Sequence, residues 1–141
     1  MSNKARYVFD TNVIVSALLF EQGNPGQAFY KALDETEILL SEEVVREIND
    51  VLSRERFDRY VAWKEREQFL QLLIRETTLV KITEEIQECR DPKDDKFLEL
   101  AVSGGASHLI TGNPDLLALD PFRGIRILTP KQFLDSLTEH K

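Results

Sequence analysis

Acidic and amide side chains stand at several points where strands or helices of this chain are expected to end or begin. Asp10 directly follows the apolar run 7–9, Asn113 and Asp115 lie in a turn after a later apolar run, and Asp94 opens a helical stretch. In a parallel sheet the carboxyl ends of the strands share one edge, so these residues can converge. Hard divalent ions such as Mg²⁺ bind a few carboxylates together with water and phosphate oxygens. A joint acid cluster therefore indicates phosphodiester or phosphoryl chemistry.

Glu47 joins this set by a different argument. It lies in the middle of a predicted helix, in line with Val44 and Val51 on its apolar face. A charge so placed needs a partner, and a cation is the expected one. Asp94 likewise continues the apolar stripe of its own helix, with Asp95 on a neighbouring line as the second choice.

Each acid also has a purely structural explanation. Asp91, Asp94 and Asp115 are favourable helix-start residues, and for each taken alone capping explains the position better than chemistry does. For Asp10, which follows a buried strand directly, the two explanations are balanced. The joint pattern is therefore more informative than any single acid.

Strand and helix patterns alternate along the whole chain. Strands are predicted over 6–10, 37–40, 78–81, 108–111 and 126–128. Helices are predicted over 11–20, around 28–33, and over 41–53, 64–75, 91–103, 114–119 and 130–137, with a turn at Gly23-Asn24-Pro25-Gly26. This alternation predicts an α/β fold with a mainly parallel five-stranded sheet covered by helices on both faces, in a single domain spanning 1–141.

Composition limits the possible functions. The 141 residues carry a net charge of -7, which argues against a generally basic nucleic-acid-binding surface. The acids are then either a solvated surface or partly gathered in a metal site. Cys89 is the only cysteine, so neither an internal disulfide nor a cysteine metal cluster can form, and a reducing cytoplasm is expected. No apolar run approaches the ~20 residues of a membrane span, and residues 1–5 lack the apolar core of a signal peptide.

Four motifs in order resemble those of the PIN domain, and more narrowly its bacterial branch of toxins from toxin–antitoxin systems. Each motif is weak alone, but the ordered set is specific and extends over about residues 6–135. The motifs are Val8-Phe9-Asp10-Thr11-Asn12-Val13, Ser41 with Glu47-Ile48, Asp91-Pro92-Lys93-Asp94-Asp95-Lys96-Phe97-Leu98, and Ile110-Thr111-Gly112-Asn113-Pro114-Asp115.

The resemblance implies a three-layer α/β/α sandwich that acts as a metal-dependent ribonuclease. In such domains acids bind Mg²⁺ or Mn²⁺ and activate water for attack on RNA. The resemblance also implies a protein antitoxin that blocks the acid pocket, and often a homodimer. Asp10, Glu47, Asp94 and Asp115 match the catalytic and metal-binding acids, whereas Asn12 and Thr111 match the supporting polar residues.

Asn113 departs from the family pattern, which has an acid two residues after Thr111. An asparagine can coordinate a metal through its carbonyl oxygen but brings no charge. Either Asp115 substitutes for the missing acid or metal affinity is reduced. A weakened PIN-like module that only binds RNA or protein is therefore the alternative function.

Two other phosphoryl-transfer folds fit less well. A receiver-type signalling domain, suggested by Thr111 and Lys131, needs paired acids after the first strand and an acceptor aspartate after the third. A haloacid-dehalogenase-like phosphatase needs an aspartate where Asn12 stands. We rank both below the nuclease.

An RNA substrate approaching an acidic edge needs nearby cations. Arg46 adjoins Glu47, and Lys93 and Lys96 flank Asp94, so we expect these three cations to contact RNA. A second basic stretch has two interpretations: a rim that binds and stacks RNA, or, as we favour, a solvated connection anchored by aromatic residues. This stretch contains Arg54, Arg56, Arg59, Tyr60 and Trp63.

Overall fold

A five-stranded parallel sheet forms the centre of the molecule. The computed structural model describes residues 4–138. The expectation that residues 1–5 are not a signal peptide therefore falls partly outside the described residues. The last three residues of the predicted domain, 139–141, also lie outside them. The strand order is β3-β2-β1-β4-β5, and every neighbouring pair is parallel, which confirms the predicted α/β fold. The strands are β1 Arg6–Phe9, β2 Glu37–Leu40, β3 Thr78–Leu79, β4 His108–Ile110 and β5 Arg126–Leu128.

The chain reverses its direction of travel across this sheet between β1 and β4. It proceeds outward from β1 to β2 and β3, and then crosses to β4 and β5 on the other side of β1. In open α/β sheets such a reversal leaves a crevice at the carboxyl ends of the two central strands. Because Phe9 pairs with Ile110 in register, the next residues, Asp10 and Thr111, lie at the crevice.

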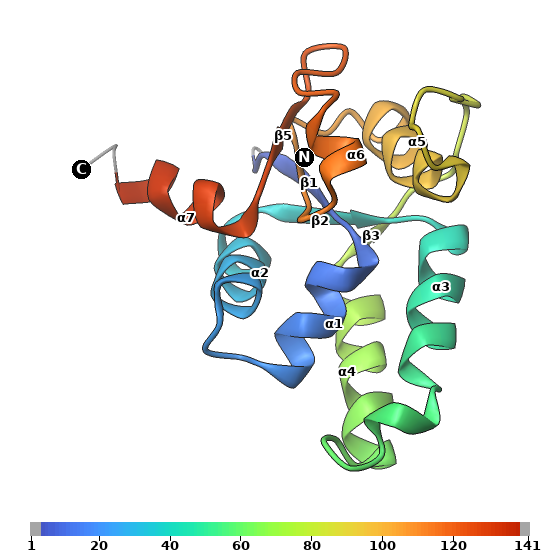
Figure 1. Cartoon of the computed structure of the whole chain (residues 1–141), viewed down its shortest axis with the longest axis vertical. Helices are drawn as coiled ribbons and strands as arrows, with labels where there is room; N and C mark the ends of the chain where they lie inside the picture. The colour runs from blue at the N-terminus through green and yellow to red at the C-terminus, as the bar shows by residue number, and fades with distance from the viewer. Residues whose placement is uncertain (1–3, 139–141) are drawn as a thin grey trace.

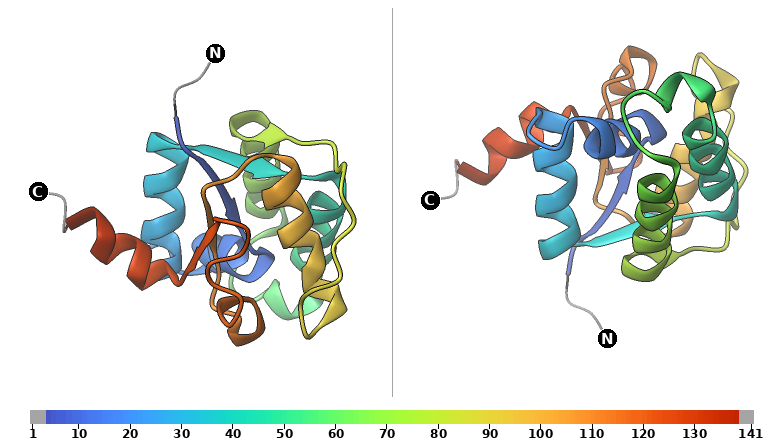
Figure 2. Two further views of the ribbon diagram at one scale, coloured as in Figure 1. Left: turned by 90° about the horizontal axis from the view of Figure 1, so that it is seen from above. Right: turned by 90° about the horizontal axis from the view of Figure 1, so that it is seen from below.

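Helices cover both sides of the sheet. Figure 1 shows α1 to α4 on one side of the β2–β3 part of the sheet, with α5 and α6 on the opposite side, and Figure 2 gives two further views of this arrangement. The last helix, α7, packs against α2 and β5. The helices are α1 Thr11–Leu19, α2 Asn24–Glu35, α3 Glu42–Leu52, α4 Trp63–Glu76, α5 Asp95–Ser103, α6 Pro114–Leu117 and α7 Pro130–Thr138, with short 3-10 turns η1 Glu55–Phe57 and η2 Pro92–Asp94.

The central strands are buried on both faces, and this explains their continuous apolar sequences. Val8 and Phe9 of β1, Leu39 of β2 and Leu109 and Ile110 of β4 are fully inaccessible to solvent. Strands covered by helices on both sides have no solvated face, so polar alternation is absent from them. A polar residue that interrupts such a strand end is correspondingly conspicuous.

The prediction of a turn at residues 23–26 is wrong. The helix α2 already begins at Asn24, with Gly23 at its N-cap and Pro25 in its first turn. Proline is well tolerated there because the first helical N–H groups have no partner within the helix. Gly26 is needed for a close approach, since a Cβ at this position would lie 2.3 Å from the carbonyl oxygen of Glu21.

The long connection before α5 is attached along that helix by side chains. Asp95 accepts hydrogen bonds from the backbone N–H groups of Cys89 (2.7 Å) and Glu88 (3.2 Å). One turn later Glu99 accepts from Ile86, and a further turn later Ser103 accepts from Thr83, both at 3.0 Å. The acceptors are spaced four residues apart, so they form one face of α5.

Within residues 4–138, none of the helices has the length and apolar character that crossing a bilayer requires.

Candidate active site

Asp10 is fixed at the crevice by contacts from the first turn of α1 and from the residue that follows β4. Its Oδ1 accepts a 2.8 Å hydrogen bond from the N–H of Val13, which caps α1, and its Oδ2 accepts one from the hydroxyl of Thr111. Only 4% of Asp10 is exposed, and Thr111 is fully buried. Each carboxylate oxygen of Asp10 has one hydrogen-bond donor and keeps a further lone pair. Asp10 can therefore cap α1 and also bind a ligand at the site.

Asp94 is held by the residue that departs from the family pattern. Asn113 Nδ2 donates a 2.7 Å hydrogen bond to Asp94 Oδ2, and Asn113 Oδ1 accepts one of 2.9 Å from the N–H of Asp115. The N–H of Asn113 in turn donates to the hydroxyl oxygen of Thr111 at 3.0 Å. A continuous chain of hydrogen bonds thus runs from Asp10 through Thr111 and Asn113 to Asp94.

Glu47 has a cationic partner, and that partner belongs to the protein. Lys96 Nζ lies 2.9 Å from Glu47 Oε2, with side-chain exposures of 13% and 33%. The contact is an ion pair without hydrogen-bond geometry, so Glu47 Oε2 is a buried oxygen that lacks a hydrogen-bond donor. Sequence reasoning missed this pair because Glu47 is on α3 and Lys96 on α5, and no spacing within one helix relates them.

Asp94 and Glu47 act electrostatically on Asp10, and Glu47 also acts on Asp94. Burial raises the pKa of Asp10, the hydrogen bonds from Thr111 and Val13 lower it, and the charges of Asp94 and Glu47 raise it. Burial also raises the pKa of Asp94; the Asn113 hydrogen bond and Lys96 oppose this, whereas Asp91 and Glu47 add to it. Three acids in one field make the ionised state costly, and a bound cation would relieve that cost.

The other predicted site residues have varied positions. Asp115 is half-buried in the first turn of α6, and Asn12 is exposed in the first turn of α1. Asp95 is directed to the backbone of Glu88 and Cys89, so its carboxylate is engaged in fixing the connection before α5.

The predicted RNA-contacting cations divide into two kinds. Lys93 and Arg46 are exposed, and Arg46 pairs with Glu42 on the same helix. Lys96 is largely enclosed beside Glu47, which leaves it little surface for a phosphate. The arginine-rich stretch 54–59 lies at the far end of α3 from the acids.

The donor chemistry fits a hard divalent ion, although the side chains are not assembled around one. Among residues 4–138, no three His, Cys, Asp or Glu side chains are arranged so that they could hold a metal. Asp94 faces Asn113, and Glu47 faces Lys96. Carboxylate oxygens are nevertheless the ligands that Mg²⁺ and Mn²⁺ prefer, and the buried Glu47 Oε2 has a free lone pair for one.

Comparison with known proteins identifies a family for this chain. A family model described as the PIN domain matches residues 6–115. "Uncharacterized protein MJ1680" of Methanocaldococcus jannaschii is 26% identical over 142 residues, which cover 94% of this chain and 91% of that protein.

Three solved structures share the fold at low sequence identity. PAE2754 from Pyrobaculum aerophilum has a TM-score of 0.63 at 17% identity, covering 96% of this chain and 90% of that one. VapBC2 from Rickettsia felis, bound to a DNA fragment from its promoter, has a TM-score of 0.60 at 12% identity (88% and 98%). The RRP44 PIN domain of T. brucei has a TM-score of 0.52 at 12% identity (98% and 83%).

Proposed function

The chain belongs to the PIN-domain family, and from this premise we propose that it is a metal-dependent endoribonuclease that hydrolyses RNA phosphodiester bonds. The observation that carries the proposal is the buried Asp10 at the reversal point of the sheet, whose pKa is raised by burial and further by the charges of Asp94 and Glu47. Its hydrogen-bond donors, Thr111 and the N–H of Val13, are neutral, so a bound divalent ion would offset a charge that these contacts do not balance.

Asp10, Glu47 and Asp94 would hold Mg²⁺ or Mn²⁺ in this proposal. The bound ion would lower the pKa of a water molecule and offset charge on the phosphate in the transition state. Asp10 is the fixed member, because Thr111 and the N–H of Val13 define its orientation. To bind the ion, Asp94 would give up its hydrogen bond with Asn113, and Glu47 would give up its ion pair with Lys96. Asp115 would orient water or complete a second metal site, and Asn12 would support the mouth of the crevice.

An RNA strand at this crevice would meet Arg46 and Lys93 first, since both are exposed. Lys96 would join them only where the pair with Glu47 opens. Exposed cations beside an acid cluster reduce the repulsion between the protein and the phosphate backbone.

A role as the toxin of a toxin–antitoxin pair is a narrower proposal. The fold shared with VapBC2 supports a cognate antitoxin and a homodimer as partners, and the single buried Cys89 suits a reducing cytoplasm. The curated relative is an archaeal protein without an assigned activity, so support for the bacterial toxin branch rests on the sequence motifs.

A second candidate function is favoured by the same contacts that close the site. The Asn113–Asp94 hydrogen bond and the Lys96–Glu47 ion pair stabilise the acids without a metal. A chain with such contacts could bind RNA or a protein partner while cutting RNA weakly.

The test is cleavage of end-labelled single-stranded RNA in Mn²⁺ by the wild type and by Asp10→Asn. The asparagine keeps the shape of the side chain and one acceptor for the Val13 N–H, so circular dichroism should show an unchanged fold. We expect wild-type cleavage that EDTA abolishes, and loss of cleavage in the variant. Cutting by Asp10→Asn at the wild-type rate would refute the site, whereas metal-insensitive cutting would refute the metal mechanism.

A further inference from the structure

Two exposed aromatic rings from separate elements line one hollow on the surface. Phe20, at the C-cap of α1, is 63% exposed, and Tyr60, in the connection after η1, is 68% exposed. The hollow has a volume of about 900 Å³, and its other lining residues include Arg56 and Arg59. Large exposed rings beside arginines form the kind of surface on which single-stranded nucleic acid stacks its bases.

The connection between α3 and α4, which carries Arg56, Arg59 and Tyr60, is fixed by a buried arginine of α4. Buried Arg66 donates to the carbonyl oxygens of Leu52 (2.8 Å) and Arg54 (3.3 Å) and forms a 2.5 Å ion pair with Asp58. Phe57 anchors the same segment in the core, and its ring lies under the guanidinium of Arg56 at 5.0 Å. Tyr60 and the two arginines are thus presented on a fixed backbone, which lowers the entropic cost of binding.

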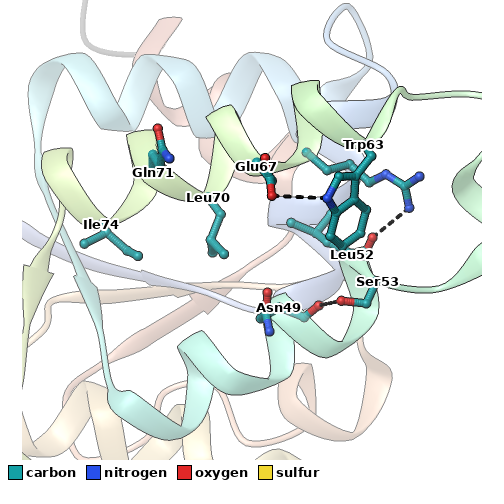
Figure 3. Close-up of a pocket in the computed structure, with 9 residues that line it drawn as sticks. Asn49, Leu52, Ser53, Trp63, Glu67, Leu70, Gln71 and Ile74 are labelled. Atoms are coloured by element: carbon teal, nitrogen blue, oxygen red, sulfur yellow. Dashed lines mark hydrogen bonds between the residues drawn. The ribbon is translucent and has the colours of Figure 1, made fainter.

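Trp63, which the sequence placed with these residues, lies elsewhere. It lines a separate cavity of about 290 Å³ between α3 and α4, together with Asn49, Leu70 and Ile74 (Figure 3). Its indole N–H donates to Glu67 at 3.1 Å. Phe20, and not Trp63, is the exposed ring beside Tyr60 in the hollow. Because Phe20 lies 40 residues earlier in the chain, the sequence around residue 60 does not predict this arrangement.

The hollow is less acidic than the chain as a whole. Its charged lining consists of Arg56 and Arg59 and of the acids Glu55 and Asp58, whereas the whole chain has a net charge of -7. One of those acids, Asp58, is neutralised by Arg66. Arg56 and Arg59 remain exposed at the rim, in a position to contact phosphates.

The hollow and the acid crevice lie at opposite ends of helix α1. Asp10 caps the first turn of α1 and Phe20 caps its last, so the helix separates them by about 15 Å. The helix α3 likewise begins at the acid edge and ends just before η1. A strand whose backbone lies at the crevice can reach the hollow by following α1 and α3.

We propose that Phe20, Tyr60, Arg56 and Arg59 form a binding surface for single-stranded RNA, which holds the substrate a helix length from the cleavage site. This inference rests on the proposed function in one respect: the bound strand is taken to be the substrate. Binding itself is independent of cleavage, and the experiment separates the two.

The experiment measures fluorescence anisotropy of an end-labelled oligoadenylate of about 12 nucleotides, using the full chain with Asp10→Asn to prevent cleavage. Tyr60→Ala and Phe20→Leu should each weaken binding roughly 5- to 150-fold, because each removes a stacking ring. Tyr60→Phe keeps the ring and should bind like the parent. Ile74→Ala, a change at an exposed apolar residue outside the hollow, is the matched control and should have no effect.

Salt dependence tests the arginines. Arg59→Gln should reduce the slope of log affinity against log salt by about 0.7, the value for one lost phosphate contact on a single strand. Arg75→Gln, at an exposed arginine of α4, should leave the slope unchanged.

Equal RNA binding by Tyr60→Ala, Phe20→Leu and the Ile74→Ala control would overturn the inference, and the proposed nuclease would stand if the wild type still cuts. Absence of RNA binding by the parent would overturn the inference; absence of cleavage by the wild type as well would overturn the proposed function. If the ring variants lose binding to a protein partner and not to RNA, the surface belongs to that partner and the inference is again wrong.

Discussion

Asn113 donates its side-chain N–H to Asp94 Oδ2 at 2.7 Å while its carbonyl oxygen caps α6. A single neutral side chain therefore satisfies one acid of the crevice and begins the helix beside it. An acid at this position would keep the cap, because aspartate is as good an N-cap as asparagine. It would replace the donor facing Asp94 with a second negative charge.

Asn113→Asp should consequently make the protein more dependent on metal. Without divalent ions the lost hydrogen bond and the new repulsion should lower the free energy of unfolding by about 1–3 kcal/mol. Mn²⁺ should then raise the melting temperature more than it does in the wild type, because one more carboxylate is available to it. Asn113→Ala loses the same hydrogen bond, and the cap of α6 with it, without adding charge, so an identical Mn²⁺ response in both variants would contradict this role.

Lys96→Met should increase the affinity for Mn²⁺. The lysine occupies Glu47 and places a positive charge near Asp94, and both effects oppose a cation. Removing about 1 kcal/mol of this opposition corresponds to roughly a fivefold lower Kd, which calorimetry can measure. Lys93→Met, at the exposed neighbouring cation, is the control. Weaker Mn²⁺ binding by Lys96→Met would instead show that Lys96 positions Glu47 as a ligand.

Asp95→Ala should affect stability and leave the chemistry intact. It removes the acceptor for the N–H groups of Glu88 and Cys89, so unfolding should become easier by about 1–3 kcal/mol. Thermal melts and RNA cleavage per folded molecule, compared with those of Asp94→Ala, check the distinction. If Asp95→Ala lost cleavage without losing stability, Asp95 would be a residue of the active site and the prediction would be wrong.

Particular residues show how far the sequence can determine this site. Strand ends are local features, and parallel pairing brings them together, so Asp10 and Thr111 could be predicted as neighbours before any coordinates. A similar local rule accounts for Ser41 at the N-cap of α3, where its hydroxyl oxygen accepts a hydrogen bond from the N–H of Val44.

Contacts between elements are beyond such rules. The pairing of Lys96 with Glu47 depends on how α5 lies against α3, and helical periodicity defines only the inward face of each helix. The acceptors Asp95, Glu99 and Ser103 have a visible spacing of four. Their role emerges only from the path of the preceding connection along α5.

His108 provides a pH test of the central strands. Burial, followed by the charge of Arg126, lowers the pKa of His108, with a partly opposing effect of Asp120. The unfolded chain then binds a proton more readily than the folded one, so stability should fall as the pH drops below the ordinary value of about 6.5. Urea melts between about pH 8 and pH 5 should show this loss in the wild type relative to His108→Gln. If the difference in unfolding free energy between the wild type and His108→Gln did not change with pH, the pKa of His108 would not be lowered in the folded protein.

We propose that Asp10, Glu47 and Asp94 together hold a catalytic divalent ion. The anomalous diffraction signal of crystals soaked in Mn²⁺ tests this proposal. We expect a peak bound by Asp10, with Asp94 turned away from Asn113 and Glu47 released from Lys96. Ordered crystals with no peak at this crevice, and with Asn113 and Lys96 still engaged at saturating Mn²⁺, would contradict it.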